Sequence, residues 1–140
     1  MDIGIILSVL ESGNSVELPA TGYSMFPTFR PGNRIIVRPL TKGEVPEPGC
    51  VVVYIDNGVL VLHRLKEVID DGSGNTMLIT QGDSLNMADK PFSREQLVGV
   101  AASYKTRKKE TSVRNYIPGQ WRYRFNRRIL WLFVKIIGQV

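Results

Sequence analysis

The chain has 140 residues, about one domain's worth and long enough to bury a hydrophobic core without cross-links. Its composition, 43% hydrophobic and 22% charged with one cysteine, excludes a disordered chain, an internal disulfide and a cysteine-based metal cluster. The net charge of +5 is uneven: residues 104–140 carry ten basic and one acidic side chains (+9) and residues 1–103 are at −4, so that only the tail favours an anionic partner.

The first residues predict a short helix and not a secretion signal. Ile3, Ile6, Leu7 and Leu10 share one helical face over residues 2–11. A signal peptide needs basic residues ahead of its apolar run, whereas the second residue here is acidic. No stretch reaches the roughly 18–20 apolar residues of a membrane-spanning helix. We therefore expect a cytoplasmic protein without a membrane anchor.

Short apolar runs between Gly, Pro and Asn turns predict a mostly-β body of coiled sheet. Asp56-Asn57-Gly58 predicts a hairpin turn, because Asn-Gly adopts positive φ at little cost. Cys50 begins an apolar run, where a small buried side chain is favoured over a reactive thiol. The expected strands cover residues 15–20, 34–38, 50–55, 59–68, 76–81 and 97–104, with a helical turn at 93–96.

The chain is predicted to divide into a domain over residues 1–104 and a tail over residues 105–140. The tail begins as a basic linker to residue 115 and becomes an amphipathic, basic-aromatic helix from about Pro118. Its Trp, Tyr and Arg side chains suit an anionic membrane surface, and residues 129–140 are too short to span but long enough to lie in the interface.

Three partners for this helix remain open: the inner face of the membrane, the body of the same chain, and a second copy in a homodimer. Arg and aromatic side chains can also stack on single-stranded nucleic acid. The long apolar run at the end of the tail argues against that use, and no specific nucleic-acid binding is expected.

Ser24 and His63 are the candidates for nucleophilic chemistry. Ser24 follows a strand end, where its hydroxyl can be presented at an edge beside backbone N–H groups that would bind an oxyanion. A serine hydroxyl needs a base to take its proton, and His63 is the one histidine of the chain. From composition alone, a turn serine and a core histidine remain open.

Two aspartates, Asp83 and Asp89, lie in the polar loop that follows the strand at 76–81. Either carboxylate could accept a hydrogen bond from the second ring nitrogen of His63 and fix its tautomer. Gly-Asp also begins ordinary turns, so this signal is weak by itself. A single histidine excludes a histidine-rich metal site, and we expect neither a metal nor a cofactor.

Taken in order along the chain, these motifs resemble the signal peptidase I and LexA-like serine peptidases, which share a β fold. The resemblance covers about residues 15–103. Its most specific part is Ser-Met-x-Pro-Thr followed by His-Arg and Gly-Asp. The matching strings are GYSMFPTFRPGN at 22–33, GCVVVY at 49–54, VLHRL at 61–65, TQGDSLN at 80–86 with Asp89, and VGV at 98–100.

The resemblance implies that Ser24 is the nucleophile. It implies that His63 is the general base, as in the endoplasmic-reticulum, archaeal and related Gram-positive enzymes, whereas most bacterial signal peptidases and LexA-like proteins use lysine. Asp89 is implied as the residue that orients His63, and Asp83 as a structural aspartate.

The chain departs from the family pattern beside the nucleophile. Many signal peptidases have a serine two residues earlier that helps to bind the oxyanion; Gly22 stands there, as in the LexA-like Gly-x-Ser-Met pattern. The oxyanion hole must then use the backbone N–H of Ser24. We assign Gly22, Met25 and Pro27 to substrate and oxyanion binding. No DNA-binding domain is expected ahead of the body, which argues against a complete LexA-type repressor.

We therefore expect a serine endopeptidase that cleaves a peptide or protein through a Ser24 acyl-enzyme. The substrate would add as a strand to an exposed sheet edge. The resemblance alone implies a small side chain at the cleavage position. Two alternatives remain: a catalytically silent member of the fold that acts as a membrane-associated binding module, and a LexA-like regulator that cleaves itself.

Overall fold

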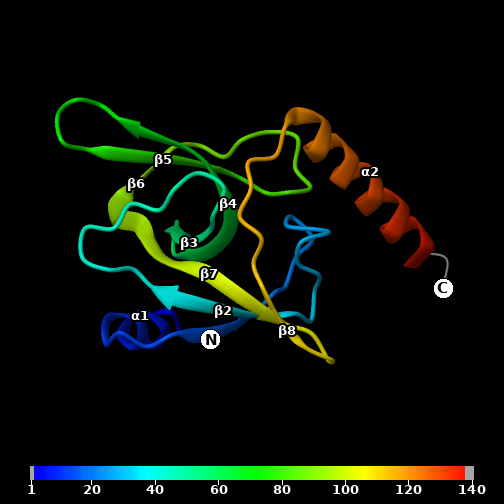
Figure 1. Cartoon of the computed structure of the whole chain (residues 1–140), viewed down its shortest axis with the longest axis horizontal. Coiled ribbons are helices and arrows are strands. Elements are labelled where there is room, and N and C mark those ends of the chain that lie inside the picture. The colour runs from blue at the N-terminus through cyan, green and yellow to red at the C-terminus, as the bar shows by residue number, and fades with distance from the viewer. Residues whose placement is uncertain (1, 138–140) are drawn as a thin grey trace.

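The computed structural model describes residues 2–137. Within them the chain forms one antiparallel sheet of eight strands, with a helix near each end (Figure 1). The predicted mostly-β fold with a short N-terminal and a C-terminal helix is confirmed. The elements are α1 (Ile3–Glu11), β1 (Val16–Pro19), β2 (Arg34–Pro39), β3 (Val51–Asp56), β4 (Val59–Asp70), β5 (Thr76–Gln81), β6 (Phe92–Ser93), the 3₁₀ turn η1 (Arg94–Gln96), β7 (Leu97–Lys105), β8 (Glu110–Ser112) and α2 (Gln120–Ile137).

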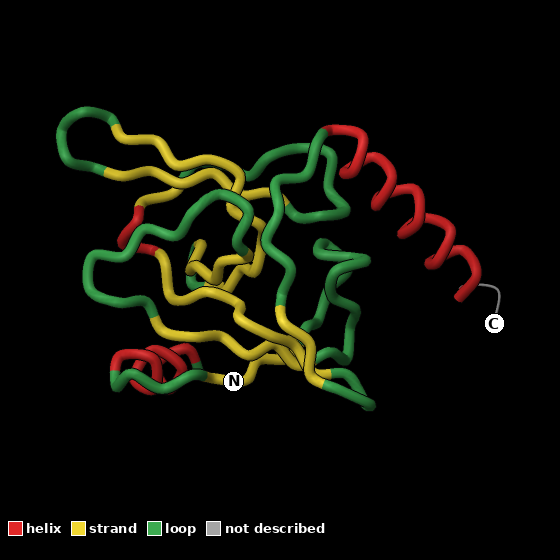
Figure 2. The backbone as a smooth tube through the Cα atoms, in the orientation of Figure 1, coloured by secondary structure: helices red, strands yellow, loops and turns green. Residues whose placement is uncertain are grey.

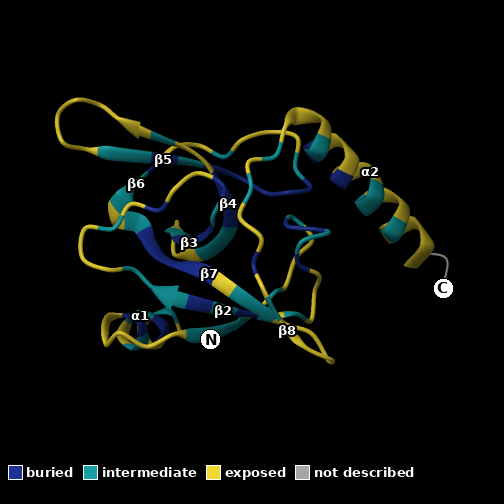
Figure 3. Ribbon diagram, in the orientation of Figure 1, coloured by how far each residue is buried: buried dark blue, intermediate teal, exposed yellow. Residues whose placement is uncertain are grey.

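The strands lie in the order β1-β2-β7-β3-β4-β5-β6, and β8 pairs with β7 off this path. The central strand β3 is buried on both faces: Val51 and Val53 belong to one core cluster, Val52 and Tyr54 to the other. A strand that packs against a core on each face needs a continuous apolar run, whereas a strand with one exposed face alternates. Val51–Tyr54 is a continuous run. Buried residues are concentrated in β3 and in its neighbours β4 and β7, whereas the outer turns are exposed (Figure 3).

Strand β4 changes partner along its length. Residues 59–64 pair with β3 and residues 64–70 pair with β5, with a register shift between Leu65 and Glu67. An irregularity of this kind bends a strand and increases its twist, and the sheet curls around β3 and β4 (Figure 2). The outer edge of residues 59–63 has no strand partner within the described chain, so that His63 lies beside a free edge.

Local sequence explains the predicted helix and hairpin. Asp2 caps α1 by accepting a hydrogen bond from the N–H of Gly4, and the apolar face of α1 buries Ile6 and Leu10. In the hairpin between β3 and β4, Asn57 and its glycine neighbour have φ values of 49° and 78°, as an Asn-Gly turn requires.

The segment predicted as a basic linker, residues 105–115, contains strand β8, which pairs with β7. Strand β8 is Glu-Thr-Ser, three residues without an apolar period, and the short strand β6 was missed for the same lack of signal. Cys50 is half-buried against the second core cluster. Among the helices described in residues 2–137, none has the length and apolar character needed to cross a membrane.

Candidate active site

Ser24 lies in the loop between β1 and β2, and a second loop fixes its backbone. The N–H of Ser84 donates to the carbonyl oxygen of Ser24 at 3.0 Å, and the Ser84 hydroxyl donates to the carbonyl oxygen of Tyr23 at 2.7 Å. The two loops approach so closely that a Cβ on Gly82 would lie 2.7 Å from the Ser24 carbonyl oxygen. Only glycine fits there, and the Gly-Asp motif therefore has a steric role beside the nucleophile candidate.

The structure brings Ser24, His63 and Asp89 together in one row. Nε2 of His63 lies 3.1 Å from Oγ of Ser24, and Nδ1 lies 2.6 Å from Oδ2 of Asp89. Because a carboxylate accepts and does not donate, the Nδ1 proton is held toward Asp89, which leaves Nε2 free to accept the serine proton. His63 is buried, and Ser24 is half-buried at the mouth of a cavity.

Two further side chains hold Asp89. Thr80 Oγ1 donates to Oδ2 of Asp89 at 2.7 Å, and the hydroxyl of Tyr54 lies 3.4 Å from the same oxygen. Burial raises the pKa of Asp89, but the hydrogen bonds from His63 and Thr80 outweigh burial, and the net pKa is below the usual value. Asp89 is therefore a carboxylate at neutral pH. Burial also raises the pKa of Tyr54 to about 12, so its hydroxyl keeps its proton.

Asp83 does not contact His63 but forms a fully buried ion pair with Arg64. Nε and Nη2 of Arg64 donate to its two carboxylate oxygens at 2.8 and 2.9 Å, and Thr28 donates to one of them. Nη1 of Arg64 donates to the carbonyl oxygens of Gly49 and Arg114. The pair ties the strand that carries His63 to the loop after β5, and Thr28 extends this contact to the loop that carries Ser24.

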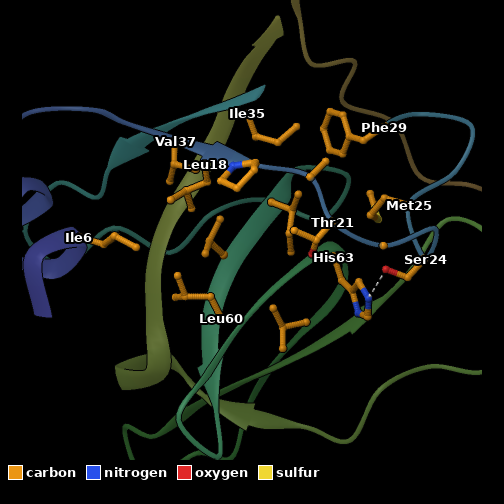
Figure 4. A pocket seen from close by; sticks show the side chains of 16 residues that line it. Ile6, Leu18, Thr21, Ser24, Met25, Phe29, Ile35, Val37, Leu60 and His63 are labelled. Atoms are coloured by element: carbon orange, nitrogen blue, oxygen red, sulfur yellow. Dashed lines mark hydrogen bonds between the residues drawn. The ribbon is translucent and has the colours of Figure 1, made fainter. Parts of the chain in front are cut away.

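A mainly apolar cavity of about 580 Å³ opens from Ser24 and His63 (Figure 4). Gly22 and Met25 line it, whereas Pro27 is not among the described residues of its wall. The other lining residues are apolar, apart from Thr21, and come from α1, from the segment that begins in β1, and from β2, β3 and β4: Ile6, Leu18, Pro19, Ala20, Phe29, Ile35, Val37, Val53, Leu60, Val61 and Leu62.

The backbone N–H of Ser24 makes no hydrogen bond to any group in residues 2–137. Such an N–H, next to the serine oxygen, can stabilise negative charge on a carbonyl oxygen that the serine attacks. A Cβ added to Gly22 would meet no atom within 4 Å, so the space two residues before Ser24 is open.

Sequence reasoning missed the side chains that support the row. Tyr54 and Thr80 are typical strand residues, so their place in a predicted strand gave no reason to infer a polar role. Thr28 lies in a segment that was predicted as a turn. Their polar roles depend on which strands become neighbours. Only the position of Thr80, in the string that leads to Gly-Asp, carried a sequence signal.

No protein-family model matches the chain. Among curated proteins, it is 30% identical over 115 residues to the signal peptidase complex catalytic subunit SEC11 of Lachancea thermotolerans. This match supports a signal-peptidase-like family for the chain. The aligned region covers 80% of this chain and 66% of the SEC11 subunit, so the signal-peptidase-like chain spans somewhat less than two thirds of that relative.

Proposed function

We propose that this signal-peptidase-like chain is a serine endopeptidase of the Ser–His type. The single observation that carries the proposal is the hydrogen-bonded row from Ser24 through His63 to Asp89, with distances of 3.1 and 2.6 Å. A hydroxyl, an imidazole and a carboxylate in this order are the parts that acyl transfer by a serine requires. The similarity to a signal peptidase catalytic subunit supports the same reaction class.

In the proposed reaction, Ser24 Oγ attacks the carbonyl carbon of the scissile peptide while Nε2 of His63 takes its proton. Asp89 holds the resulting imidazolium through Nδ1, and the backbone N–H of Ser24 donates to the oxyanion. His63 then gives the proton to the leaving amine. His63 then takes a proton from a water molecule, which attacks the acyl carbon, and the bond to Ser24 Oγ breaks to release the second product. The proton passes from His63 to Oγ, which restores the Ser24 hydroxyl.

The peptide would lie extended in the cavity between two unpaired strand edges. In the described part of the chain, strand β1 is one of the two end strands of the sheet, and residues 59–63 of β4 have a free outer edge. Residues of both segments line the cavity, including Leu18 and Leu60. Backbone groups on both sides could pair with a substrate strand, as in other cases of strand addition. The scissile bond would then reach Ser24 at the end of the cavity.

A serine-directed fluorophosphonate probe tests the proposal. We expect it to label the wild-type chain and to fail with Ser24→Ala, and with His63→Ala to label at least about 100-fold more slowly, the size of a general-base contribution. Ser8→Ala is the matched control, because Ser8 is exposed on α1. Labelled mass and rate are read by intact-protein mass spectrometry, and folding by circular dichroism.

The outcomes separate the functions considered. A folded wild-type chain that is not labelled overturns the peptidase proposal and leaves a binding module. Labelling that survives Ser24→Ala places the nucleophile elsewhere. If the wild-type chain without probe generates a fragment of itself, and Ser24→Ala or prior labelling abolishes this, the substrate is the chain itself and not a second peptide.

A further inference from the structure

Helix α2 has one face on the body and a second face, apolar and basic, that no other element of residues 2–137 covers. Tyr123 and Asn126 are buried, and the ring of Phe133 lies 5.1 Å from that of Phe26. The spacing of three and then seven residues keeps these side chains on one side of the helix. The amide of Asn126 also donates to the carbonyl oxygen of Asp83 at 2.9 Å, which fixes the helix against the loop beside Ser24.

The opposite side of α2 carries an exposed apolar stripe. Trp121, Phe125, Leu132 and Ile136 are 68%, 47%, 52% and 64% exposed. Their spacing of four, seven and four residues gathers them along one line of the helix. No element of residues 2–137 covers this line, and most of α2 is exposed in Figure 3. Large apolar side chains gathered on one surface in this way mark an interaction site.

The charges beside this stripe indicate an anionic partner. Within Gln120–Ile137 there are five basic side chains and no acidic one. Arg124, Arg128 and Lys135 follow one another at spacings of four and seven residues, directly beside the apolar stripe. A second copy of α2 would bring the same positive charges together. A nucleic acid would satisfy the cations but leave Leu132 and Ile136 in water.

We propose that α2 docks in the plane of an anionic lipid bilayer, with the stripe of Trp121, Phe125, Leu132 and Ile136 in the headgroup–acyl boundary. Arg124, Arg128 and Lys135 would contact lipid phosphates at the edge of the stripe. This combination of an apolar face, flanking cations and tryptophan is the pattern of helices that lie in a membrane interface. The proposal does not depend on peptidase activity.

Intrinsic fluorescence gives a direct measurement, because both tryptophans of the chain lie on α2. We expect the full chain to bind vesicles of phosphatidylcholine with about 30% phosphatidylglycerol, with a blue shift of emission and quenching by brominated lipid. Binding to pure phosphatidylcholine should be about 100-fold weaker, the loss expected for roughly three cation contacts. Raising the salt concentration should weaken binding to the anionic vesicles.

Two sets of variants separate charge from the apolar stripe. Arg124→Gln, Arg128→Gln and Lys135→Gln together should weaken binding about 100-fold. The same change of charge at Arg107, Lys108 and Lys109, which are exposed in the loop before β8, should weaken it less than about threefold. Leu132→Ser with Ile136→Ser should reduce the partition coefficient by more than about tenfold and lower the quenching.

The proposal is overturned if neutral and anionic vesicles bind equally, or if the loop variant loses as much affinity as the helix variant. It is also overturned if the emission shift appears without lipid as protein concentration rises, which would indicate a second copy. Tighter binding to a single-stranded oligonucleotide than to the anionic vesicles would assign the face to nucleic acid instead.

Discussion

Ser24, His63 and Asp89 lie on three separate segments, and each is oriented by a contact outside the row. Ser84 fixes the backbone of Ser24, and Thr80 fixes the carboxylate of Asp89. His63 is held by its place in β4 and by the two partners of its ring. A side chain whose neighbours restrict it loses little freedom when the reaction begins, and this favours acyl transfer at the site.

Asp89→Asn should lower kcat by about 100-fold or more while the fold is retained. An amide can present its NH₂ group to His63, which reverses the tautomer and turns Nε2 into a donor that cannot take the Ser24 proton. Hydrolysis of a quenched peptide gives kcat, and thermal unfolding checks the fold. A kcat within threefold of wild type would show that Asp89 does not set the tautomer.

Gly22→Ser should raise kcat by about tenfold, because its hydroxyl would be a second donor to the oxyanion. The substitution is sterically open, since a Cβ there meets no atom within 4 Å and the backbone of Gly22 lies outside the left-handed region. Gly22→Ala is the control and should leave kcat within about twofold. Equal effects of serine and alanine would contradict an oxyanion role.

Prediction from sequence was uneven for these residues. Ser24 and His63 stood out through the motif order and because His63 is the only histidine. The choice between Asp83 and Asp89 could not come from local sequence, because both lie in one polar loop. Their contacts depend on the neighbours that the fold supplies: Arg64 pairs with Asp83, whereas Thr80 and Tyr54 lie beside Asp89.

Among the elements, β4 has the largest influence on the site, because it carries His63 and, at the next residue, Arg64. Successive side chains of a strand point to opposite faces. His63 therefore points toward Ser24 while Arg64 points into the interior, where it meets Asp83. One strand thus supplies both the proposed base and the cation that aligns two loops.

Arg64→Met should destabilise the chain by about 3–5 kcal/mol, because Asp83 would remain buried as an uncompensated charge. Arg64→Met with Asp83→Leu should recover at least half of that loss, since two apolar side chains leave no buried charge. Urea unfolding measures both. A double variant that is no more stable than Arg64→Met would contradict the ion-pair explanation.

The Arg38–Glu44 pair joins β2 to the following loop, and it predicts a pH effect on stability. Hydrogen bonds from the Arg38 guanidinium and then from the backbone of Thr41 lower the pKa of Glu44 to about 2. A carboxyl whose pKa is lower in the folded state contributes stability above its unfolded pKa, roughly 4.3, and loses it as the pH falls toward 2.

Glu44→Gln should therefore cost about 1 kcal/mol at pH 7, the range of a partly exposed ion pair. This cost should shrink as the pH falls from about 4.3 toward 2. Glu47→Gln is the matched control, because the Glu47 side chain is exposed and makes no hydrogen bond within residues 2–137. Urea unfolding at several pH values tests this, and a cost that is independent of pH would disprove it.

Strands with an apolar run were predicted well, because a strand buried on both faces, such as β3, needs that run whatever its neighbours. Strands β6 and β8 could not be predicted. Each is two or three residues long and forms only because a longer strand, β5 or β7, offers its edge. Their pairing comes from tertiary contact and not from the residues themselves.

For the whole molecule, the separation into an acidic body and a basic tail was visible in the charges of the sequence, but the position of α2 was not. Apolar side chains occur on both sides of the helix, so periodicity alone could not choose the side that faces the body. The choice depends on the rings of Tyr23 and Phe26, which contact Phe133. Through them, α2 contacts the residue that precedes Ser24.

Phe133→Ala should lower stability by about 1–2 kcal/mol, because a half-buried ring loses its contacts. It should also lower kcat about threefold to tenfold with little change in KM, because the loop that holds Ser24 becomes less ordered. Phe125→Ala is the matched control, since Phe125 lies on the exposed side of α2. Equal losses for the two variants would contradict a link between helix and loop.

Two strand edges beside the cavity, one in β1 and one in residues 59–63 of β4, have no strand partner within residues 2–137, and this has a consequence for selectivity. Main-chain amides are alike in every peptide, so strand edges that pair with them select substrates by backbone conformation first and by side chain second. A helical or compactly folded segment has already used its amides internally and cannot enter. Cleavage would then be confined to tethers and termini that can straighten, and a well-folded neighbouring protein would be spared without any inhibitor.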